Sequence, residues 1–523
     1  MAANCRWARI ADGAAVNAFR AIAIALLAGL AGCAAGPNYH VPKSDAPPKF
    51  AAVVINSNST DTAKNAPAVD LATWWRALND DELNSLVDRA IKSNLDLQIA
   101  LDRLQQARTY EAVVLGDALP TVDASAAAGR GTGSDLTKGR ADPLLRSADT
   151  GAGLQQINTV AGFSAVWELD IFGKYRREFE AARDDTQAVR AARYEVLTAV
   201  VADVVRAYVD LRGFQVRGGI LHKASEVLRE SLRIVNIRYV RGITNELDVA
   251  LATRELATLE AEIAPVEAQI TAAQYTLAVL VGEYPESMVQ ELTKPDLVPA
   301  MPEPTSPGVP LDLLKRRPDI QQAERELAAS TARIGVATAS LFPQIVVGGS
   351  IGSQSQGWGT LPNVSKHIWS FGPGALWPLL DFGALDAEVG IADLAAHASL
   401  LNYRRTILNA VRQVDTSIDG YQAQQARLLK LGDALMAGQR AVDLATARYN
   451  RGLTDFLNVV DAERQLYDLQ EQYATAQVAQ GEEFVQLYKS LGGGWQDYQA
   501  VPPIRRPQPA IIAAFRRAIS NSQ

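Results

Sequence analysis

RYVRGITNELDV, at residues 238–249, returns as RYNRGLTDFLNV at residues 448–459. Seven of the twelve positions are identical, and the offset between the two copies is 448 − 238 = 210. The same offset aligns further pairs: Trp167 and Trp377, Phe172 and Phe382, Gly173 and Gly383, Gly282 and Gly492. Because self-similarity at a fixed offset marks a duplicated structural unit, we expect two copies of one folding plan.

Upstream of these pairs the offset changes to 223, as Pro120 and Pro343 show. The first copy therefore holds 223 − 210 = 13 additional residues between its proline and its tryptophan. Variable length is typical of a surface loop, and this segment contains GRGTGSD at residues 129–135. We expect two strands around a glycine-rich loop here, and again around residues 352–362 in the second copy.

Each copy has the same expected order: a helix (81–115 and 311–339), a strand pair and a long helical hairpin. The chain divides into a leader (1–32), an anchored linker (33–70), a first repeat (71–283), a proline-rich linker (284–310), a second repeat (311–493) and a tail (494–523). Within the repeats the strand pairs cover 116–172 and 341–382, and the hairpins cover 173–283 and 383–493.

The hairpin helices carry an apolar seam with alternating spacings of three and four residues, which is typical of coiled coils. A helix from residue 174 to about 239 would measure about 100 Å. At the turns, Gly242 and Gly452 suit a left-handed cap after each helix, and Thr244 and Thr454 are candidate N-caps for the returning helices. Pro265 is expected to kink the first returning helix. The seam residues are Tyr194, Leu197, Val201, Val204, Tyr208 and Leu211, then Ile407, Val411, Val414, Ile418 and Tyr421.

The N-terminus has the pattern of a processed leader: a basic region, an apolar stretch at 21–30, and LAGC at 30–33. Small residues before Cys33 resemble a lipoprotein signal, so we expect diacylglycerol and an N-acyl chain on this cysteine. Cys5 is the only other cysteine, which leaves no disulfide framework and no thiolate metal site in the body. We expect no metal and no further cofactor, and the net charge of −7 gives no sign of nucleic-acid binding.

After the leader, no stretch of 18 consecutive apolar residues occurs, so the sequence predicts no transmembrane helix. A body that crosses a membrane must then do so as a closed β-barrel. Four strands are too few to close a barrel, because even small barrels have eight. A membrane-spanning interpretation therefore requires oligomerisation.

The duplicated plan, the W-x₄-FG steps at 167–173 and 377–383, and the Y-x-x-G turns at 239–242 and 449–452 resemble the TolC family of outer-membrane efflux factors. The cysteine signal followed by GPNYHVP at 36–42 resembles its lipoprotein (NodT-like) branch. The resemblance implies a mixed α+β homotrimer, with one twelve-stranded β-barrel continuous with a long periplasmic α-helical barrel. It further implies a mixed equatorial domain built from the linker pieces and the tail. It also implies a passive channel in the outer membrane of a Gram-negative bacterium, served by a periplasmic adaptor (membrane fusion) protein and an inner-membrane RND-type transporter.

The same resemblance assigns gate residues. Leu457 and Asp461 lie four apart on one helix face and match residues that form rings across the pore, and Asp248 and Tyr449 match a gate-locking hydrogen bond. Asn458 and Thr454 depart from residues that strengthen some related gates. The adaptor-contact candidates at the tips are Arg238, Gly242, Thr244, Arg448, Gly452 and Thr454.

Two other interpretations stay open. GGSIG at 348–352 fits the G-x-S-x-G pattern of hydrolases, but that pattern requires a strand-to-helix elbow, so we expect a barrel strand and no enzyme. A lipid-anchored periplasmic coiled-coil scaffold would explain the helices without a membrane-spanning body, but it would leave the strand pairs without a purpose.

Overall fold

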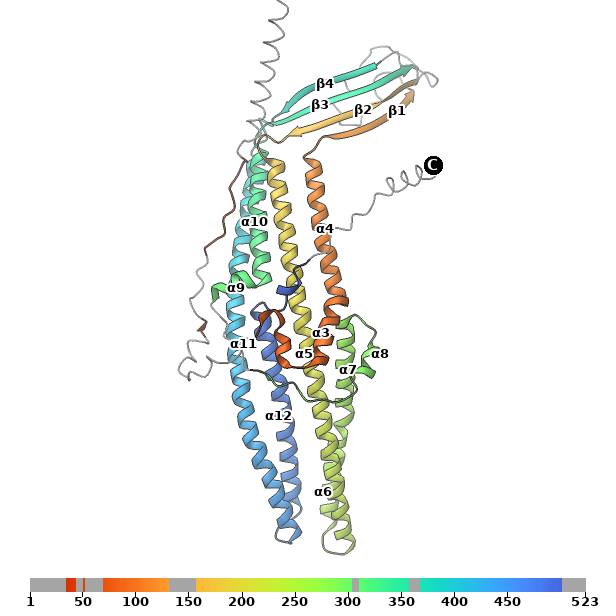
Figure 1. Cartoon of the computed structure of the whole chain (residues 1–523), viewed down its shortest axis with the longest axis vertical. Coiled ribbons are helices and arrows are strands. Elements are labelled where there is room, and N and C mark those ends of the chain that lie inside the picture. The colour runs from red at the N-terminus through yellow and green to blue at the C-terminus, as the bar shows by residue number, and fades with distance from the viewer. Residues whose placement is uncertain are drawn as a thin grey trace, which may run out of the picture.

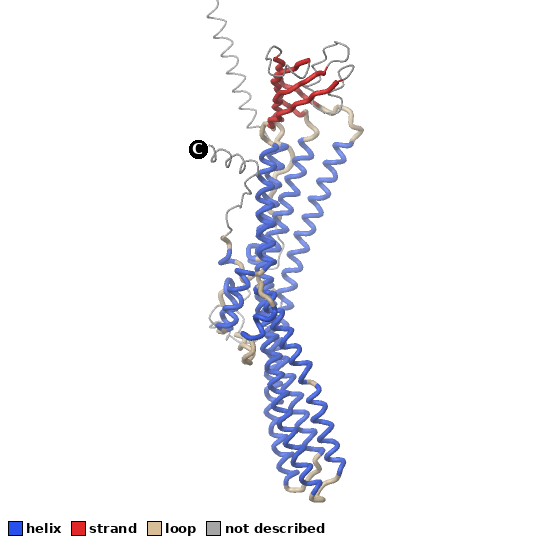
Figure 2. The backbone as a smooth tube through the Cα atoms, turned by 90° about the vertical axis from the view of Figure 1, so that its right-hand side faces the viewer, coloured by secondary structure: helices blue, strands red, loops and turns tan. Residues whose placement is uncertain are grey.

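The computed structural model describes residues 34–43, 50–51, 69–130, 157–302, 310–356 and 367–500. The predicted leader, Cys33 and most of the tail lie outside these residues. Figure 1 shows an elongated molecule with a small sheet at one end, long helices running away from it, and two hairpin tips at the far end. Figure 2 shows the short helices gathered beside the middle of the long ones.

The duplication is visible in the two longest helices. α5 (Lys174–Val240) and α11 (Ala384–Asn450) have 67 residues each, and both their starts (384 − 174) and their ends (450 − 240) differ by 210. No helix among the described residues is both long enough and apolar enough to cross a membrane. The other helices are η2 (Leu71–Leu78), α3 (Asp81–Ser93), α4 (Leu95–Asp117), α6 (Glu246–Ala261), α7 (Ile263–Val281), α8 (Pro285–Glu291), α9 (Pro310–Arg316), α10 (Pro318–Ala339), α12 (Leu457–Ser490) and η5 (Gln496–Tyr498).

The sheet has the order β1-β2-β3-β4, and every neighbouring pair is antiparallel. The strands are β1 (Thr121–Arg130), β2 (Ile157–Leu169), β3 (Gln344–Gln356) and β4 (His367–Leu376). Phe163, Ile351 and Trp369 pair across the sheet and are all exposed. The next row holds Ser164, Ser350 and Ser370. Since side chains alternate between faces, one face is apolar and the other polar.

The main core lies at mid-length, where the short helices pack on α5, α7 and α12. Trp74 of η2 stacks on Tyr488 of α12 with ring centroids 5.5 Å apart. The start of the predicted tail joins this core, because Trp495 stacks on Tyr194. The six seam residues predicted on α5 are buried, but Val200, Val205 and Val209 between them are buried as well, so the buried face of α5 is broader here than the predicted coiled-coil seam. The six residues are Tyr194, Leu197, Val201, Val204, Tyr208 and Leu211.

Two predicted helices are each broken into two. The opening helix of the first repeat ends at Asn94, whose side chain accepts a hydrogen bond from the Leu97 N–H and donates one to the Leu280 carbonyl. In the second repeat, the opening helix breaks at Arg317, immediately before Pro318, as expected for a residue that precedes proline. The predictions of continuous helices were wrong because side-chain capping and proline chemistry override the apolar periodicity.

The first returning helix is interrupted at Glu262, between α6 and α7, within one turn of Pro265, which agrees with the predicted kink at this proline. The N-caps of the returning helices differ from the prediction. Thr244 and Thr454 are not the N-caps: Asn245 caps α6 by accepting from the Asp248 N–H, and the residue before α12 is Phe456, which makes no side-chain cap. The glycine prediction is confirmed, since Gly242 and Gly452 have φ of +71° and +70°.

Candidate functional site

The two hairpin tips lie side by side at the end of the molecule farthest from the sheet (Figure 1). A small apolar cluster joins them, with Val235 of α5 and Ala252 of α6 contributed by the first hairpin. The second hairpin contributes Tyr449, Phe456, Val459 and Val460. The tips of one chain therefore form a single packed unit, although 210 residues separate their turns.

The predicted gate residues Leu457 and Asp461 lie on the first turns of α12. Both side chains are exposed, and Asp461 accepts a hydrogen bond from the Gln465 side chain at 2.8 Å. Val459 and Val460, which lie between them, point into the apolar cluster. Leu457 and Asp461 are therefore available to a partner or to a pore on the side away from that cluster.

The predicted lock pair is close but unbonded. Tyr449 is 6% exposed, its ring packs against Phe456, and the guanidinium of Arg238 lies 4.3 Å from the ring centroid. Its hydroxyl has no hydrogen-bond partner among the described residues. Burial raises the pKa of this hydroxyl, and Asp248 is near enough to raise it further. Asp248 instead accepts a hydrogen bond from the Thr244 hydroxyl.

The adaptor-contact candidates are not equally accessible. Arg448, Gly242 and Gly452 are exposed, whereas Arg238, Thr244 and Thr454 are half-buried. Arg238 is occupied by its contact with the Tyr449 ring, and Thr454 accepts a hydrogen bond from Asn458 at 2.7 Å. The exposed part of the candidate surface is thus the turn backbone with Arg448.

Sequence reasoning missed the apolar residues beside these turns. Val240 is 84% exposed, Ile243 60% and Leu453 64%. Large exposed apolar side chains clustered on one end of a molecule indicate an interaction surface. The sequence repeat could have predicted this apolar surface, because Ile243 and Leu453 occupy the same position after the Arg-Gly turn in the two copies.

A buried carboxylate between the hairpins was also missed. The Ser231 hydroxyl of α5 donates to Glu463 of α12 at 3.2 Å, and the second carboxylate oxygen of Glu463 is buried with no partner in the described part of the chain. Burial raises the pKa of Glu463. The position of Glu463 in the sequence does not predict its burial, because only the packing of α12 on α5 removes its carboxylate from water.

At the other end, the first described residues lie where the sheet meets the helices. The Ala35 N–H donates to the Phe172 carbonyl at 3.0 Å, between β2 and α5. Arg177, which is 4% exposed, donates to the Ala35 carbonyl at 3.1 Å and to the Asn38 side chain at 2.7 Å. Gly36 packs directly on Gly335. The segment that follows Cys33 is therefore held at this junction.

Ser350, the serine of the G-x-S-x-G stretch, lies in the middle of β3. Its hydroxyl is 2.9 Å from that of Ser370 across the strand pair. This position is not the strand-to-helix elbow that a nucleophilic serine of this pattern occupies.

Comparisons with known proteins agree with this geometry. The family described as "Outer membrane efflux protein" matches residues 86–283 and 309–493. Nodulation protein T of Rhizobium leguminosarum bv. trifolii is 32% identical over 89% of this chain and 95% of its own length. The pyoverdine export outer membrane protein OpmQ of Pseudomonas aeruginosa is 30% identical over 83% and 90%.

The solved structure of the outer-membrane channel OprN superimposes with a TM-score of 0.78 at 33% identity, covering 89% of this chain and all of that one. OpmQ is named as an outer membrane export protein, and OprN as an outer-membrane channel. The two matched segments coincide with the two repeats, so the similarity covers the helical hairpins as well as the sheet. The chain belongs to the outer membrane efflux protein family and is an outer-membrane component of an efflux pump.

Proposed function

We propose that three copies of this chain close into one passive channel, a twelve-stranded β-barrel above a tunnel of helices. The observation that carries the proposal is that the sheet formed by the described residues has two open edges. β1 and β4 are the outer strands of the order β1-β2-β3-β4, and within the described ranges each pairs with one other strand only. A head-to-tail contact between β4 of one copy and β1 of the next closes a ring when the rotation allows it.

The helices repeat the same arrangement below the sheet. α4 packs on α5, α5 on α10, and α10 on α11, which leaves α4 and α11 as the outer helices. Both outer helices expose large apolar residues: Ile99 and Val113 on α4, and Leu394, Leu401 and Leu408 on α11. Burial of such rows against a second copy is favourable by about 25 cal/mol for each Å² of apolar surface.

The two faces of the sheet suit a barrel wall. The apolar face, with Phe371 at 75% exposure, would lie against lipid, and the polar face with Ser370 would line the lumen. Phe371 and Ser370 are adjacent in β4 but lie on opposite faces of the sheet, so the same substitution at each position compares the two faces. An arginine on the lipid face of a barrel costs about 2–4 kcal/mol at the membrane midplane, whereas an arginine in the lumen contacts water.

The test combines these variants with a mass measurement. Light scattering of the purified protein should give three chains per detergent particle. Phe371→Arg should reduce the amount of assembled protein in the outer membrane, and Ser370→Arg should leave it near the wild-type level. Equal behaviour of both variants, or a monomeric mass, would favour the non-spanning coiled-coil scaffold.

The tips supply the proposed gate. In a trimer, Leu457 and Asp461 would form two rings, and three aspartates held together repel one another unless they are hydrated, protonated or bridged by a cation. The Asp248–Tyr449 lock would form in the closed assembly if Asp248 left Thr244. What supports both proposals is the exposure of Leu457 and Asp461 and the proximity of Asp248 to Tyr449.

The partners proposed are a periplasmic adaptor at the tips and an inner-membrane RND-type transporter that supplies the energy. A photo-crosslinking residue placed at Arg448 should capture an adaptor protein in cells. The same residue placed at Leu401 should capture a second copy of this chain. Capture of this chain from both positions would remove the tips as the adaptor surface.

Acylation of Cys33 is the last part of the proposal. Support comes from Ala34 and Ala35, which are held at the sheet–helix junction, so a lipid on the preceding residue would start at the level where the sheet begins. Mass spectrometry of the mature N-terminal peptide should show the acyl groups. A Cys33→Ser variant should lack them and remain unprocessed.

A further inference from the structure

The two repeats of this chain follow one register in the sheet. Thr121 pairs with Val166. Adding the repeat offsets, 223 and 210, gives Gln344 and Leu376, which pair as well. The same addition converts every pair of β1 and β2 into a pair of β3 and β4. We call the residue at the equivalent position of the other repeat the counterpart; it lies 223 residues away for β1 and α4, and 210 residues away for β2 and α5.

One contact joins the two repeats inside each chain, where β2 pairs with β3 and α5 packs on α10. The counterparts of β2 and α5 are β4 and α11, and those of β3 and α10 are β1 and α4. In the proposed ring, β4 and α11 of one chain lie against β1 and α4 of the next. The contact between the repeats therefore provides a pattern for the contact between chains, because stacked repeats reuse one kind of interface.

Large apolar side chains of α11 are exposed at positions whose counterparts on α5 are buried. Leu394 is exposed, whereas its counterpart Asp184 is buried and accepts a hydrogen bond from Arg325 of α10 at 3.2 Å. Spacings of three and seven residues place the other buried counterparts on the same face of α5 as Asp184. The exposed face of α11 thus corresponds to the face of α5 that α10 covers. The further pairs are Ile391 with Ala181, Leu401 with Ala191, and Leu408 with Thr198.

The outer face of α4 resembles the face of α10 that contacts α5. On α10 this face includes Gly335, where an added Cβ would lie 2.8 Å from the Arg177 side chain of α5. Small residues on the same face allow the two helices to approach closely. The counterparts on α4 are also small, and they are exposed. The pairs are Ala332 with Thr109, Gly335 with Ala112, and Ala339 with Gly116.

A pair of glycines shows the same match in the sheet. Gly162 of β2 pairs with Gly352 of β3, and an added Cβ on Gly162 would lie 2.8 Å from the Gly352 Cα atom. Their counterparts, Gly372 of β4 and Gly129 of β1, are glycines as well. Within the described residues, an added Cβ on Gly372 would meet no atom within 4 Å. Both outer strands thus offer a glycine where the register of the repeats would bring the two together.

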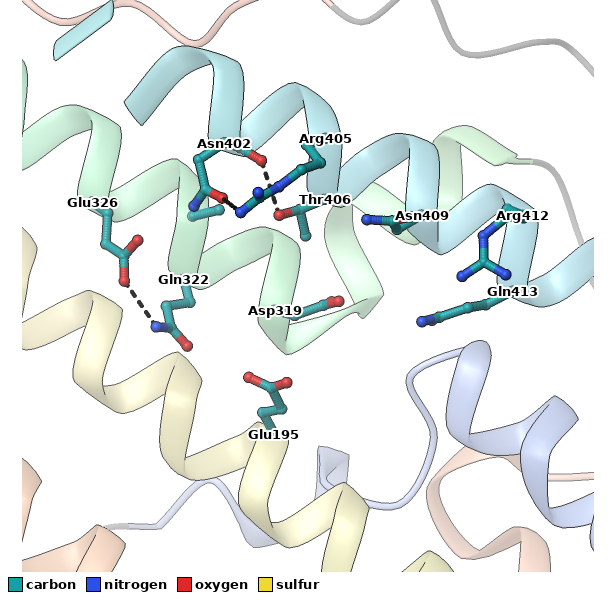
Figure 3. A pocket seen from close by; sticks show the side chains of 11 residues that line it. Glu195, Asp319, Gln322, Glu326, Asn402, Arg405, Thr406, Asn409, Arg412 and Gln413 are labelled. Carbon is teal, nitrogen blue, oxygen red and sulfur yellow. Dashed lines mark hydrogen bonds between the residues drawn. The ribbon is translucent and has the colours of Figure 1, made fainter. Parts of the chain in front are cut away.

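The charges at the two contacts differ. Glu195 of α5 and Asp319 of α10 line one polar pocket, and Figure 3 shows the Glu195 carboxylate pointing toward Asp319. Burial, followed by the negative charge of Asp319, raises the pKa of Glu195. The counterparts are Arg405 of α11 and Asp96 of α4, which are both exposed. Two carboxylates inside the chain therefore correspond to a guanidinium group and a carboxylate on the outer helices.

We propose that the contact between neighbouring chains reproduces the contact between the repeats, with Arg405 of one chain paired with Asp96 of the next. The proposal rests on the proposed ring of three chains and names the surfaces that close it. Strand β4 would meet β1 in the register that sets Gly372 opposite Gly129, and Leu401 would be buried against α4. Guanidinium and carboxylate groups make strong charge-assisted hydrogen bonds, and a head-to-tail contact repeats this pair around the ring.

The residues beside Asp96 leave its carboxylate available for this pair. Inside the chain, Asp319 is held by Arg317, which donates to both of its oxygens. The counterpart of Arg317 is Asn94, which carries no charge. The α4 carboxylate therefore lacks the neighbouring cation that neutralises its counterpart on α10.

Arg103 of α4 is the positive group that opposes the pair. Its counterpart is Glu326, which affects the pKa of Glu195 less than Asp319 does. The same geometry would put Arg405 nearer to the α4 carboxylate than to Arg103. Because Coulomb energy falls with distance, attraction exceeds repulsion at this contact.

The first test exchanges the two charges. Trimers of Arg405→Asp, Asp96→Arg and the double variant are diluted in detergent, and light scattering follows their dissociation. Each single variant places like charges together, so it should dissociate about tenfold faster than wild type or more. The double variant restores an opposite pair and should return near the wild-type rate. Where a single variant gives only monomers, recovery of trimers in the double variant supports the proposal equally.

Arg404→Asp is the matched control, because it makes the same change of charge one residue away on α11. The counterpart of Arg404 is Tyr194, which stacks on Trp495. This control should dissociate at the wild-type rate. Equal acceleration in Arg404→Asp and Arg405→Asp would overturn the proposal, and so would a double variant that dissociates as fast as the faster single variant.

A cross-link locates the contact independently of stability. Asp96→Cys combined with Arg405→Cys, treated with a short bifunctional thiol reagent in the purified full chain, should join chains into dimers and trimers on a denaturing gel. Asp96→Cys combined with Arg404→Cys should give a much lower yield, and the parent chain is the blank for its own cysteines. Equal yields from the two combinations would refute the pairing.

Light scattering of the parent protein separates failure of this contact from failure of the ring. Three chains per particle, without rescue by the double variant and without a selective cross-link, refute the contact alone. A monomeric parent protein refutes the contact and the ring together.

Discussion

The packing of the tips can be tested at Tyr449, because its ring and its hydroxyl can be removed separately. Tyr449 places its ring in the apolar cluster beneath the guanidinium of Arg238, but its hydroxyl is buried without a partner in the described residues. Replacing it with alanine removes the ring, and replacing it with phenylalanine removes only the hydroxyl. The two variants should therefore differ in their effect on the stability of the tip, and only the loss of the ring should destabilise it.

The magnitudes follow from burial. Truncating a buried aromatic ring to alanine costs about 3–5 kcal/mol, and loss of the cation–π contact adds about 0.5–1 kcal/mol. About 1.4 kcal/mol corresponds to a factor of ten, so Tyr449→Ala should raise the local opening constant at least 100-fold. An unpartnered buried polar group costs about 1–3 kcal/mol. While Asp248 stays bonded to Thr244, as in this structure, Tyr449→Phe should therefore leave tip stability unchanged or increase it.

Hydrogen exchange of the purified protein, followed on peptides covering 231–249 and 445–463, measures this opening directly. Tyr449→Ala should lose protection in both peptides, because the cluster joins both hairpins. Tyr449→Phe should retain it. If Tyr449→Phe loses as much protection as Tyr449→Ala, the hydroxyl is bonded in the assembled protein, as the proposed Asp248–Tyr449 lock requires, and packing of the ring does not explain the stability of the tip.

Three further predictions concern backbone, charge and close packing. Gly452→Ala should destabilise the tip by about 1 kcal/mol, because the backbone φ there is +70°, although an added Cβ would meet no atom within 4 Å. The control Gly432→Ala, at a helical position with the same open space, should not destabilise the tip. The rate of proteolytic cleavage at the tips measures the difference between the two variants. Burial and the charge of Glu482 raise the pKa of Asp210 to about 6. The folded protein therefore holds the Asp210 proton more tightly than the unfolded chain does. This contribution to folding stability is fully present below about pH 4 and is lost as the pH rises through 6. Asp210→Asn should then melt higher than wild type at pH 8 and equally at pH 4, whereas equal melting at both would exclude this linkage. Gly335→Ala should displace residues 34–43, because an added Cβ would lie 2.8 Å from both the Ala35 carbonyl oxygen and the Arg177 side chain. Proteases should then cleave this segment faster than in wild type. The control Gly390→Ala, where an added Cβ meets no atom within 4 Å, should leave the cleavage rate unchanged.

The long helices and the tip turns could be predicted from the sequence because their signals are local and repeated. The heptad seam of α5 extends over many turns, and Gly242 and Gly452 follow the same dipeptide pattern in both copies. The break at Asn94 could not be predicted in this way. It depends on a tertiary contact, the hydrogen bond from the Asn94 side chain to the Leu280 carbonyl.

The candidate site was predicted in part. Leu457 and Asp461 share one exposed helix face, as the four-residue spacing required. The state of Asp248 could not be anticipated, since its choice between Thr244 and Tyr449 depends on how closely the two hairpins pack.

The most direct test of the channel is single-channel conductance of the purified protein in planar bilayers, with Asp461→Ala beside it and the exposed tip variant Asp455→Ala as the control. We predict a small, cation-selective conductance for wild type and Asp455→Ala, and a larger or less selective one for Asp461→Ala. Absence of conductance from all three proteins, in preparations with verified trimers, would contradict the assignment of this chain as a channel.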